Sequence, residues 1–149
     1  MVFGIGWVIL QATLVFTAGD RPDHIFGFRM FPEASTLEIR LGRETARGRT
    51  AAPRGEWSAR DAGGQLRHFA WKDRVRDPVL RAVDMRVFAS YGVDTQLARL
   101  AHALDDVADH IPEDAETRRL YADVVVRKNG HDPATVHLES HARTEPVGR

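Results

Sequence analysis

The first nineteen residues form a continuous apolar segment that carries no charged side chain. Its polar side chains, Gln11, Thr13 and Thr17, do not form a continuous stripe on a helix. A helix of this length spans roughly 28 Å, close to the roughly 30 Å hydrocarbon core of a bilayer. The pattern therefore predicts a transmembrane anchor over residues 1–19. A cleaved export signal and a buried helix of a soluble core are the alternative interpretations.

Small and aromatic residues in and after this segment are typical of a helix that docks on membrane partners. Gly4 and Gly6 allow close approach of another backbone, and Gln11 can hydrogen-bond across a helix interface. Residues 20–35 contain several aromatic rings and predict an interfacial segment beside the membrane. The predicted membrane or partner contacts are Gly4, Gly6, Trp7, Gln11, Phe26, Phe28, Arg29 and Phe31.

Strict alternation of apolar and polar residues begins in the next segment. Leu37, Ile39 and Leu41 alternate with polar residues, which predicts a half-buried strand. Residues 42–55 show no periodicity and contain three glycine residues, four arginine residues and one proline. We therefore expect a loop there.

Two later segments have the pattern of β-hairpins. Residues 56–71 are expected to turn at the glycine-containing 61–64 segment, and residues 119–140 are expected to turn at Asn129 and Gly130. The side chains expected to point inward are Trp57, Ala59, Leu120, Ala122, Val124, Val126, Val136 and Leu138.

Two helical segments are expected between the hairpins. Residues 77–91 begin with Asp77 as a potential cap and repeat apolar residues at helical spacing. Residues 94–111 show the clearest helical pattern, with Asp94 as the expected cap and Pro112 as the stop. The apolar residues expected on one face of this second helix are Leu97, Leu100, Ala101, Leu104, Val107, Ala108 and Ile111.

Together these patterns predict an α+β chain. An N-terminal transmembrane helix is expected to precede a small antiparallel sheet of about five strands, with two helices packed on one face. The folded domain is predicted over residues 36–143, and residues 144–149 are predicted to form a tail.

Charge and composition narrow the classes of function. Charged residues make up 28% of the chain and balance to a net charge of zero, so no overall field favours nucleic acid as a partner. The chain has no cysteine, which excludes disulfides, thiolate metal sites and a cysteine nucleophile. One basic cluster stands out between residues 42 and 55. We expect it to be solvated or to contact lipid headgroups or a partner through Arg43, Arg47, Arg49 and Arg54.

Histidine and aspartate residues form two further patterns, in the 94–111 helix and near the C-terminus. They lack the spacing of known metal motifs and are interpreted as solvated, so no metal or cofactor is predicted. The alternatives are a divalent-cation site on the helix face and a metal or pH-sensing site at the C-terminal histidines. No phosphate-binding loop or nucleophile elbow is present, and no catalytic residue is assigned. The residues of the two patterns are His102, Asp105, Asp106 and Asp109, and His131, His137 and His141.

The stretch FGFRMFPEASTLEIRL, with the 94–111 helix, resembles uncharacterised short single-pass membrane-anchored proteins of GC-rich bacteria. The resemblance implies a location at the bacterial cytoplasmic membrane and carries no assigned activity. The side of the membrane stays open, with the extracytoplasmic side slightly favoured.

The predicted function is a non-catalytic, single-pass accessory or structural subunit of a larger bacterial membrane complex, for example a respiratory or photosynthetic one. Its predicted partners are the lipid bilayer and other membrane-protein subunits, without nucleic acid. Two alternatives stay open: a membrane-tethered enzyme or metal-binding domain, and a membrane-tethered sensor or peptide-binding domain.

Overall fold

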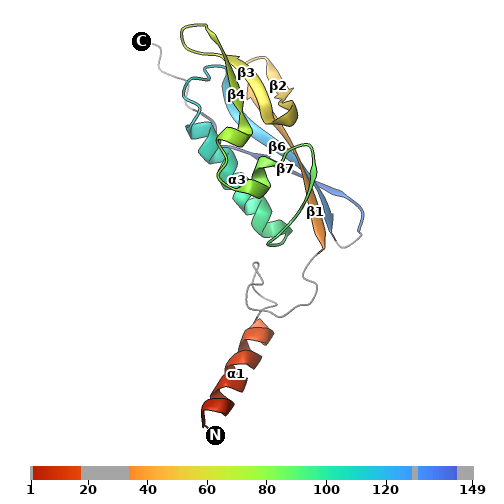
Figure 1. Cartoon of the computed structure of the whole chain (residues 1–149). Coiled ribbons are helices and arrows are strands. Elements are labelled where there is room, and N and C mark those ends of the chain that lie inside the picture. Colours follow the sequence, from red (N-terminus) through yellow and green to blue (C-terminus); the bar gives the residue numbers. More distant parts are fainter. Residues whose placement is uncertain (1, 18–33, 129–130, 144–149) are drawn as a thin grey trace.

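The structure is a computed structural model that describes residues 2–17, 34–128 and 131–143 (Figure 1). In order along the chain, its elements are α1 (Val2–Thr17), β1 (Ser35–Thr45), β2 (Gly48–Ala51), β3 (Glu56–Arg60), β4 (Leu66–Ala70), α2 (Pro78–Arg81), β5 (Arg86–Phe88), α3 (Val93–Asp109), β6 (Thr117–Lys128) and β7 (Ala134–Glu139). Two short 3-10 turns, Pro53–Gly55 and Trp71–Asp73, flank the β3–β4 hairpin.

The prediction of a single-pass transmembrane anchor over residues 1–19 is wrong. Helix α1 has 16 residues. A helix of that length rises roughly 24 Å, short of the roughly 30 Å that a bilayer core requires. Within the described residues, no helix combines the length and the apolar character needed to cross a membrane. The absence of charge indicates an apolar segment but does not determine the length of a helix, and the described helix covers Val2–Thr17.

The main sheet is antiparallel and is built around two long strands. Its order is β2-β1-β6-β7. Strand β5 also pairs with β1, at residues 36–38, whereas β2 pairs with residues 42–45 of the same strand. Strands β1 and β6 pair over almost their whole length, with a register shift at Glu44 and Thr45. The β3–β4 hairpin forms a separate two-stranded sheet. The fold is therefore α+β, with a mostly antiparallel sheet of five strands.

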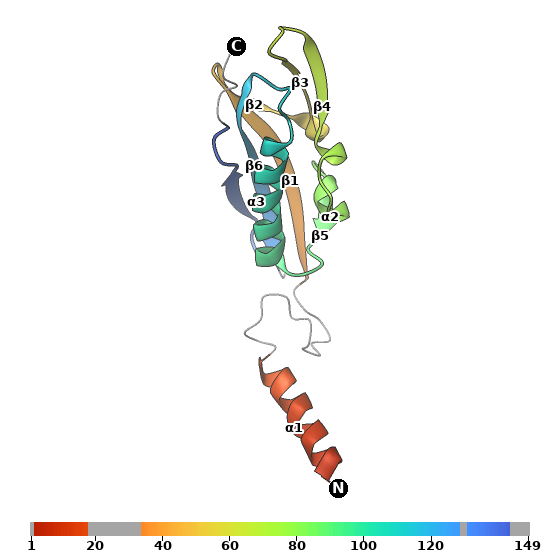
Figure 2. The same ribbon diagram turned by 90° about the vertical axis from the view of Figure 1, so that its left-hand side faces the viewer.

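One face of the main sheet packs against α3 (Figures 1 and 2). Leu37 lies opposite Val126 and Ile39 lies opposite Val124, so the alternating apolar residues of both strands reach the same core. The β3–β4 hairpin adds Trp57 to this core. The predicted inward positions of β3 and β6 are confirmed, since all of them are buried: Trp57, Ala59, Leu120, Ala122, Val124 and Val126.

Two predicted elements differ from the structure. A loop was expected over residues 42–55, but β1 continues to Thr45 and β2 follows within the same segment. A tight turn between the two strands lets β2 fold back and pair with β1. The expected helix over residues 77–91 stops after four residues of α2. Asp84 has a φ of 58°, and its amide donates to the carbonyl of Ile39, which turns the chain into β5.

Helix α3 (Val93–Asp109) lies in its predicted segment and buries the predicted face, but a different residue caps its N-terminus. Gly92 occupies the cap position with a φ of 84° and provides no side-chain cap, so the predicted Asp94 cap is wrong. The helix ends at Asp109, before Pro112, as expected. The buried face includes Gln96 together with Leu100, Leu104, Val107 and Ala108.

Gln96 is expected to make the domain less stable than an apolar residue of the same shape would. Its side chain is fully buried, and neither its amide nitrogen nor its oxygen has a hydrogen-bond partner in the described part of the chain. Methionine has a similar shape and leaves no polar atom unpaired. Gln96→Met should therefore raise the free energy of unfolding by about 1 kcal/mol in urea denaturation.

The control for this substitution is Gln65→Met in the exposed β3–β4 turn, which should change the free energy of unfolding by less than about 0.5 kcal/mol. A clear loss of stability in Gln96→Met would mean that the buried amide has a partner that compensates its burial.

Candidate anion-binding site

A pocket of about 570 Å³ lies at one end of the main sheet and brings four arginine residues together. It is formed by the β1–β2 hairpin, the loop that leads into β6, the start of β6 and the last described residues. Its lining residues are Arg43, Thr45, Ala46, Arg47, Thr50, Ala115, Glu116, Thr117, Arg118 and Arg143. Two of the four predicted arginine contacts, Arg43 and Arg47, therefore share one cavity.

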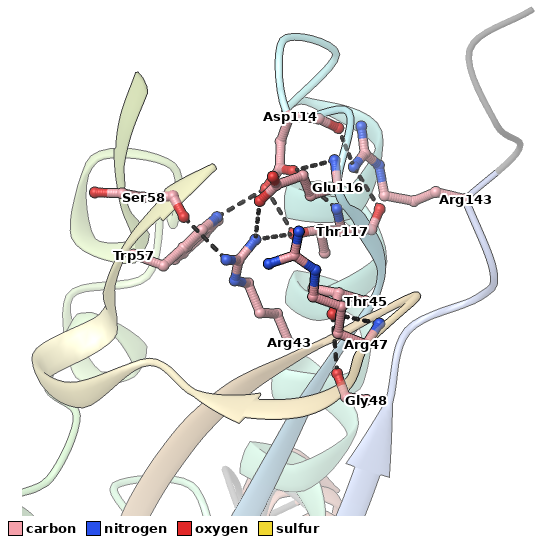
Figure 3. Close-up of polar contacts among 10 residues, drawn as sticks. All are labelled: Arg43, Thr45, Arg47, Gly48, Trp57, Ser58, Asp114, Glu116, Thr117 and Arg143. Atoms are coloured by element: carbon pink, nitrogen blue, oxygen red, sulfur yellow. Dashed lines mark hydrogen bonds and ion pairs between the residues drawn. The ribbon is translucent and has the colours of Figure 1, made fainter. Parts of the chain in front are cut away.

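The tight turn between β1 and β2 positions Arg47. Thr45 pairs with Gly48, which leaves Ala46 and Arg47 as the two turn residues. The Thr45 hydroxyl accepts from the Arg47 amide at 3.2 Å and donates to the Gly48 carbonyl at 3.1 Å. Gly48 has a φ of 115°, a backbone conformation that glycine adopts without strain. Figure 3 shows the Arg47 side chain extending from this turn towards Thr117.

Arg43 is held within the wall of the pocket. Its guanidinium donates to the Ser58 carbonyl at 2.9 Å and to the Thr117 hydroxyl at 3.3 Å. Its side chain is only 12% exposed, and the carboxylate of Glu116 lies 3.7 Å from its Nη1 (Figure 3). These contacts fix the orientation of the guanidinium while leaving its charge weakly compensated, because Glu116 is partly solvated and is not in hydrogen-bond contact.

Arg143 reaches the pocket from the chain segment after β7. Its guanidinium donates to the carbonyls of Asp114 and Thr117, both at 2.8 Å, and to that of Ile111 at 2.7 Å. Burial lowers the pKa of Arg143 from its ordinary value, and the nearby carboxylate of Asp114 opposes this change. Carbonyl oxygens orient a guanidinium without neutralising it, so Arg143 contributes positive charge to the pocket.

The loop before β6 is held by the buried carboxylate of Asp114. Its Oδ1 accepts from the amides of Glu116 at 3.0 Å and Thr117 at 2.8 Å. Its Oδ2 accepts from the Trp57 indole at 2.8 Å and the Thr117 hydroxyl at 2.6 Å. Asp114 therefore connects the pocket wall to the β3–β4 hairpin (Figure 3).

Among the described lining residues, arginine is the most frequent charged residue. Four arginine residues line the pocket with one carboxylate, that of Glu116, and the buried carboxylate of Asp114 lies near Arg143. The Arg47 guanidinium makes no hydrogen bond or ion pair with any residue that the structure describes, so its five donors are available to a ligand. A cavity of this charge suits an oxyanion, which guanidinium groups bind with paired hydrogen bonds.

The other two arginine residues of the predicted cluster lie elsewhere. Arg49 points to the opposite face of the sheet, where it pairs with Glu139. The backbone amide of Arg54 donates to the Asp84 carboxylate at 2.6 Å, and its side chain does not line the pocket. Sequence reasoning missed Arg118 and Arg143 because they are distant in sequence from the basic cluster. The only signal was their basic character near the two ends of the second hairpin.

The predicted contacts of the N-terminal region form no site in the described structure. Gly6, Trp7 and Gln11 are exposed on α1, where 54% of Trp7 is accessible to solvent. Gly4 lies in the same helix, and Phe26, Phe28, Arg29 and Phe31 lie outside the described residues. Residues 20–33 of the predicted interfacial segment and the predicted tail also lie outside them.

The structure brings one C-terminal histidine to the acidic face of α3 and places another on the opposite face of the sheet. His141 contacts the α3 carboxylates of Asp105 and Asp109, both at 2.9 Å, whereas His137 lies on the other face of the sheet and contacts Asp123 at 2.6 Å. Over residues 2–17, 34–128 and 131–143, no group of three or more suitable side chains could hold a metal ion.

Comparison with known proteins adds no functional assignment to this geometry. No protein-family model matches the chain, and no curated protein or solved structure matches it significantly. The function therefore has to be inferred from the chemistry of the arginine pocket.

Proposed function

We propose that this protein is a non-catalytic binding domain that holds an oxyanion group of a ligand or partner in the arginine pocket. The observation that carries the proposal is the charge of Arg47, which no residue of the described structure compensates, beside a largely buried Arg43 and a carbonyl-bound Arg143. Three guanidinium groups with fixed or available donors suit a group that carries two negative charges, such as a sulfate or phosphate ester.

The chemistry of the lining supports binding without a reaction. Its polar side chains are arginine, threonine and one glutamate, and the Thr117 hydroxyl is already engaged with Asp114. A threonine nucleophile would need an adjacent base, and Thr45 donates to a backbone carbonyl instead. The role of accessory subunit in a bacterial membrane complex, the membrane-protein partners and the membrane location stay predictions.

The proposal is tested by titrating the full chain with sulfate while chloride keeps the ionic strength constant. We expect saturable binding with a dissociation constant on the order of 1 mM, followed through the amide NMR signals of Arg47 and Gly48. Arg47→Gln should raise this constant about tenfold, because a hydrogen bond to a charged group contributes about 1.5 kcal/mol. A parallel titration with acetate distinguishes a doubly charged oxyanion from a single carboxylate.

Arg54→Gln is the matched control, because Arg54 is another exposed arginine of the same basic segment and lies outside the pocket. Its sulfate affinity should equal that of the unmodified chain. Equal losses in both variants would indicate a general charge effect, and the absence of saturable sulfate binding would refute the proposal.

A further inference from the structure

A second cluster of charged residues lies on the sheet face opposite α3 and touches the hairpin that carries Arg47. Arg49 of β2 pairs with Glu139 of β7 and stacks over the Tyr121 ring, 5.3 Å from its centroid. Tyr121 lies over Gly42, where a Cβ atom would come within 2.2 Å of the ring. The His137 ring lies 5.8 Å from Tyr121. The cluster therefore spans the sheet from β2 to β7.

The Nε2 atom of His137 has two competing partners. It lies 2.9 Å from the carboxylate of Glu139, an acceptor, and 3.3 Å from Nη1 of Arg49, a donor. Its Nδ1 atom lies 2.6 Å from the carboxylate of Asp123 and can donate to it in both protonation states. Neutral His137 can therefore accept from Arg49 through Nε2, whereas the imidazolium donates to Glu139 instead.

Arg49 is the side chain that ties the β1–β2 hairpin to the far edge of the sheet. Strand β2 has β1 as its strand partner in the described sheet, and the Arg49 contacts reach past β1 to β6 and β7. The same hairpin supplies five lining residues of the arginine pocket, namely Arg43, Thr45, Ala46, Arg47 and Thr50. Arg49 is two residues from Arg47 in this hairpin, so a change in the contacts of Arg49 can alter the position of Arg47.

We propose that the protonation state of His137 regulates oxyanion binding in the arginine pocket through Arg49 and the β1–β2 hairpin. This inference rests on the proposed function of the pocket. The neutral ring gives Arg49 a second acceptor beside Glu139, and this additional contact restrains the hairpin. The imidazolium competes with Arg49 for Glu139 and repels its charge, which loosens the hairpin and weakens binding.

The pH range follows from the groups that face His137. Hydrogen bonds to Asp123 and then Glu139 raise the pKa of His137 above its ordinary value, and the charge of Arg49 opposes this change. Binding should therefore tighten as the pH rises through neutrality and the ring loses its proton. The charged or titratable groups around the ring are Arg40 of β1, Arg49 of β2, Arg119, Tyr121 and Asp123 of β6, and Glu139 of β7.

The direction in which anion affinity changes with pH separates this mechanism from a general charge effect. A protein loses positive charge as the pH rises, so simple electrostatics predicts weaker anion binding at high pH. The arrangement at His137 predicts the reverse. Sulfate is a suitable probe because it stays a dianion across the whole range, so the pH dependence belongs to the protein.

The test is a series of sulfate titrations of the full chain between about pH 6 and pH 8.5. We expect the dissociation constant to fall about fivefold with rising pH, the lower end of typical coupling between two sites. His137→Gln should remove this fall, because its amide does not titrate. The control His68→Gln changes an exposed histidine of β4 and should keep the fall.

A second measurement tests the switch without a ligand. In the unmodified chain, the amide NMR signals of Arg47 and Gly48 should shift with the same midpoint as the His137 ring, and in His137→Gln this shift should vanish. The inference is overturned if these signals do not follow His137, or if sulfate binds with the same pH dependence in both proteins. Absence of sulfate binding at every pH would refute the proposed function, and the inference with it.

Discussion

Replacing Asp114 with alanine is expected to lower the free energy of unfolding by about 3 kcal/mol, because it leaves several buried donors without an acceptor. Asp114 is 1% exposed and accepts four hydrogen bonds, from the Trp57 indole, the Thr117 hydroxyl and the amides of Glu116 and Thr117. Trp57 is itself 7% exposed, so water cannot easily replace the lost partner. Urea denaturation monitored by tryptophan fluorescence measures the loss.

The asparagine variant of the same residue separates charge from shape. An asparagine side chain at this position would present an amide nitrogen, itself a donor, to one of the two pairs of donors. The Trp57 indole can only donate, so it cannot accept a hydrogen bond from that nitrogen. Asp114→Asn should therefore also destabilise the domain, by less than the alanine variant. Glu113→Ala, at an exposed position of the same loop, is the control and should change stability by less than about 0.5 kcal/mol. Equal effects at residues 113 and 114 would contradict the buried network.

The elements that sequence patterns predicted well are those with a strong local period. Strand β6 alternates from Leu120 to Val126, and α3 repeats its apolar residues along its length. Each of these segments buries one continuous face, so its own residues determine its structure. The β3–β4 hairpin was predictable for a similar reason, since Trp57 and Ala59 face the core on either side of an exposed residue.

The elements that were predicted wrongly depend on distant partners or on a single backbone conformation. All four residues of β2 are exposed, so no apolar alternation could indicate a strand that exists by pairing with β1. Strand β5 follows a helical pattern that a positive φ at Asp84 interrupts. For α1, an uncharged composition indicated a membrane span, but the helix is too short for one.

Sequence patterns indicated two of the four arginine residues that line the candidate site. Arg43 and Arg47 belong to one basic cluster, and their role as contacts for an anionic group was a natural hypothesis. Arg143 joins them only because the segment after β7 returns to the loop before β6, where its guanidinium finds three carbonyls. Contacts across 26 to 32 residues of sequence have no local signature.

Replacing Leu104 with aspartate should be more damaging than any other change considered, since Leu104 is fully buried at the centre of the α3 face that packs on the sheet. A carboxylate there has no partner, so we expect a loss of more than about 4 kcal/mol and a chain that does not fold. Leu104→Ala is a milder variant whose stability can be measured, and we expect its free energy of unfolding to fall by about 3 kcal/mol because of the cavity that it creates.

The control is Asp106→Ala, two residues away on the exposed face. It should change the free energy of unfolding by less than about 0.5 kcal/mol, because its contact with His110 is solvated. Circular dichroism and urea denaturation would measure all three. If Asp106→Ala were as costly as Leu104→Ala, α3 would have to pack on the sheet through a different face.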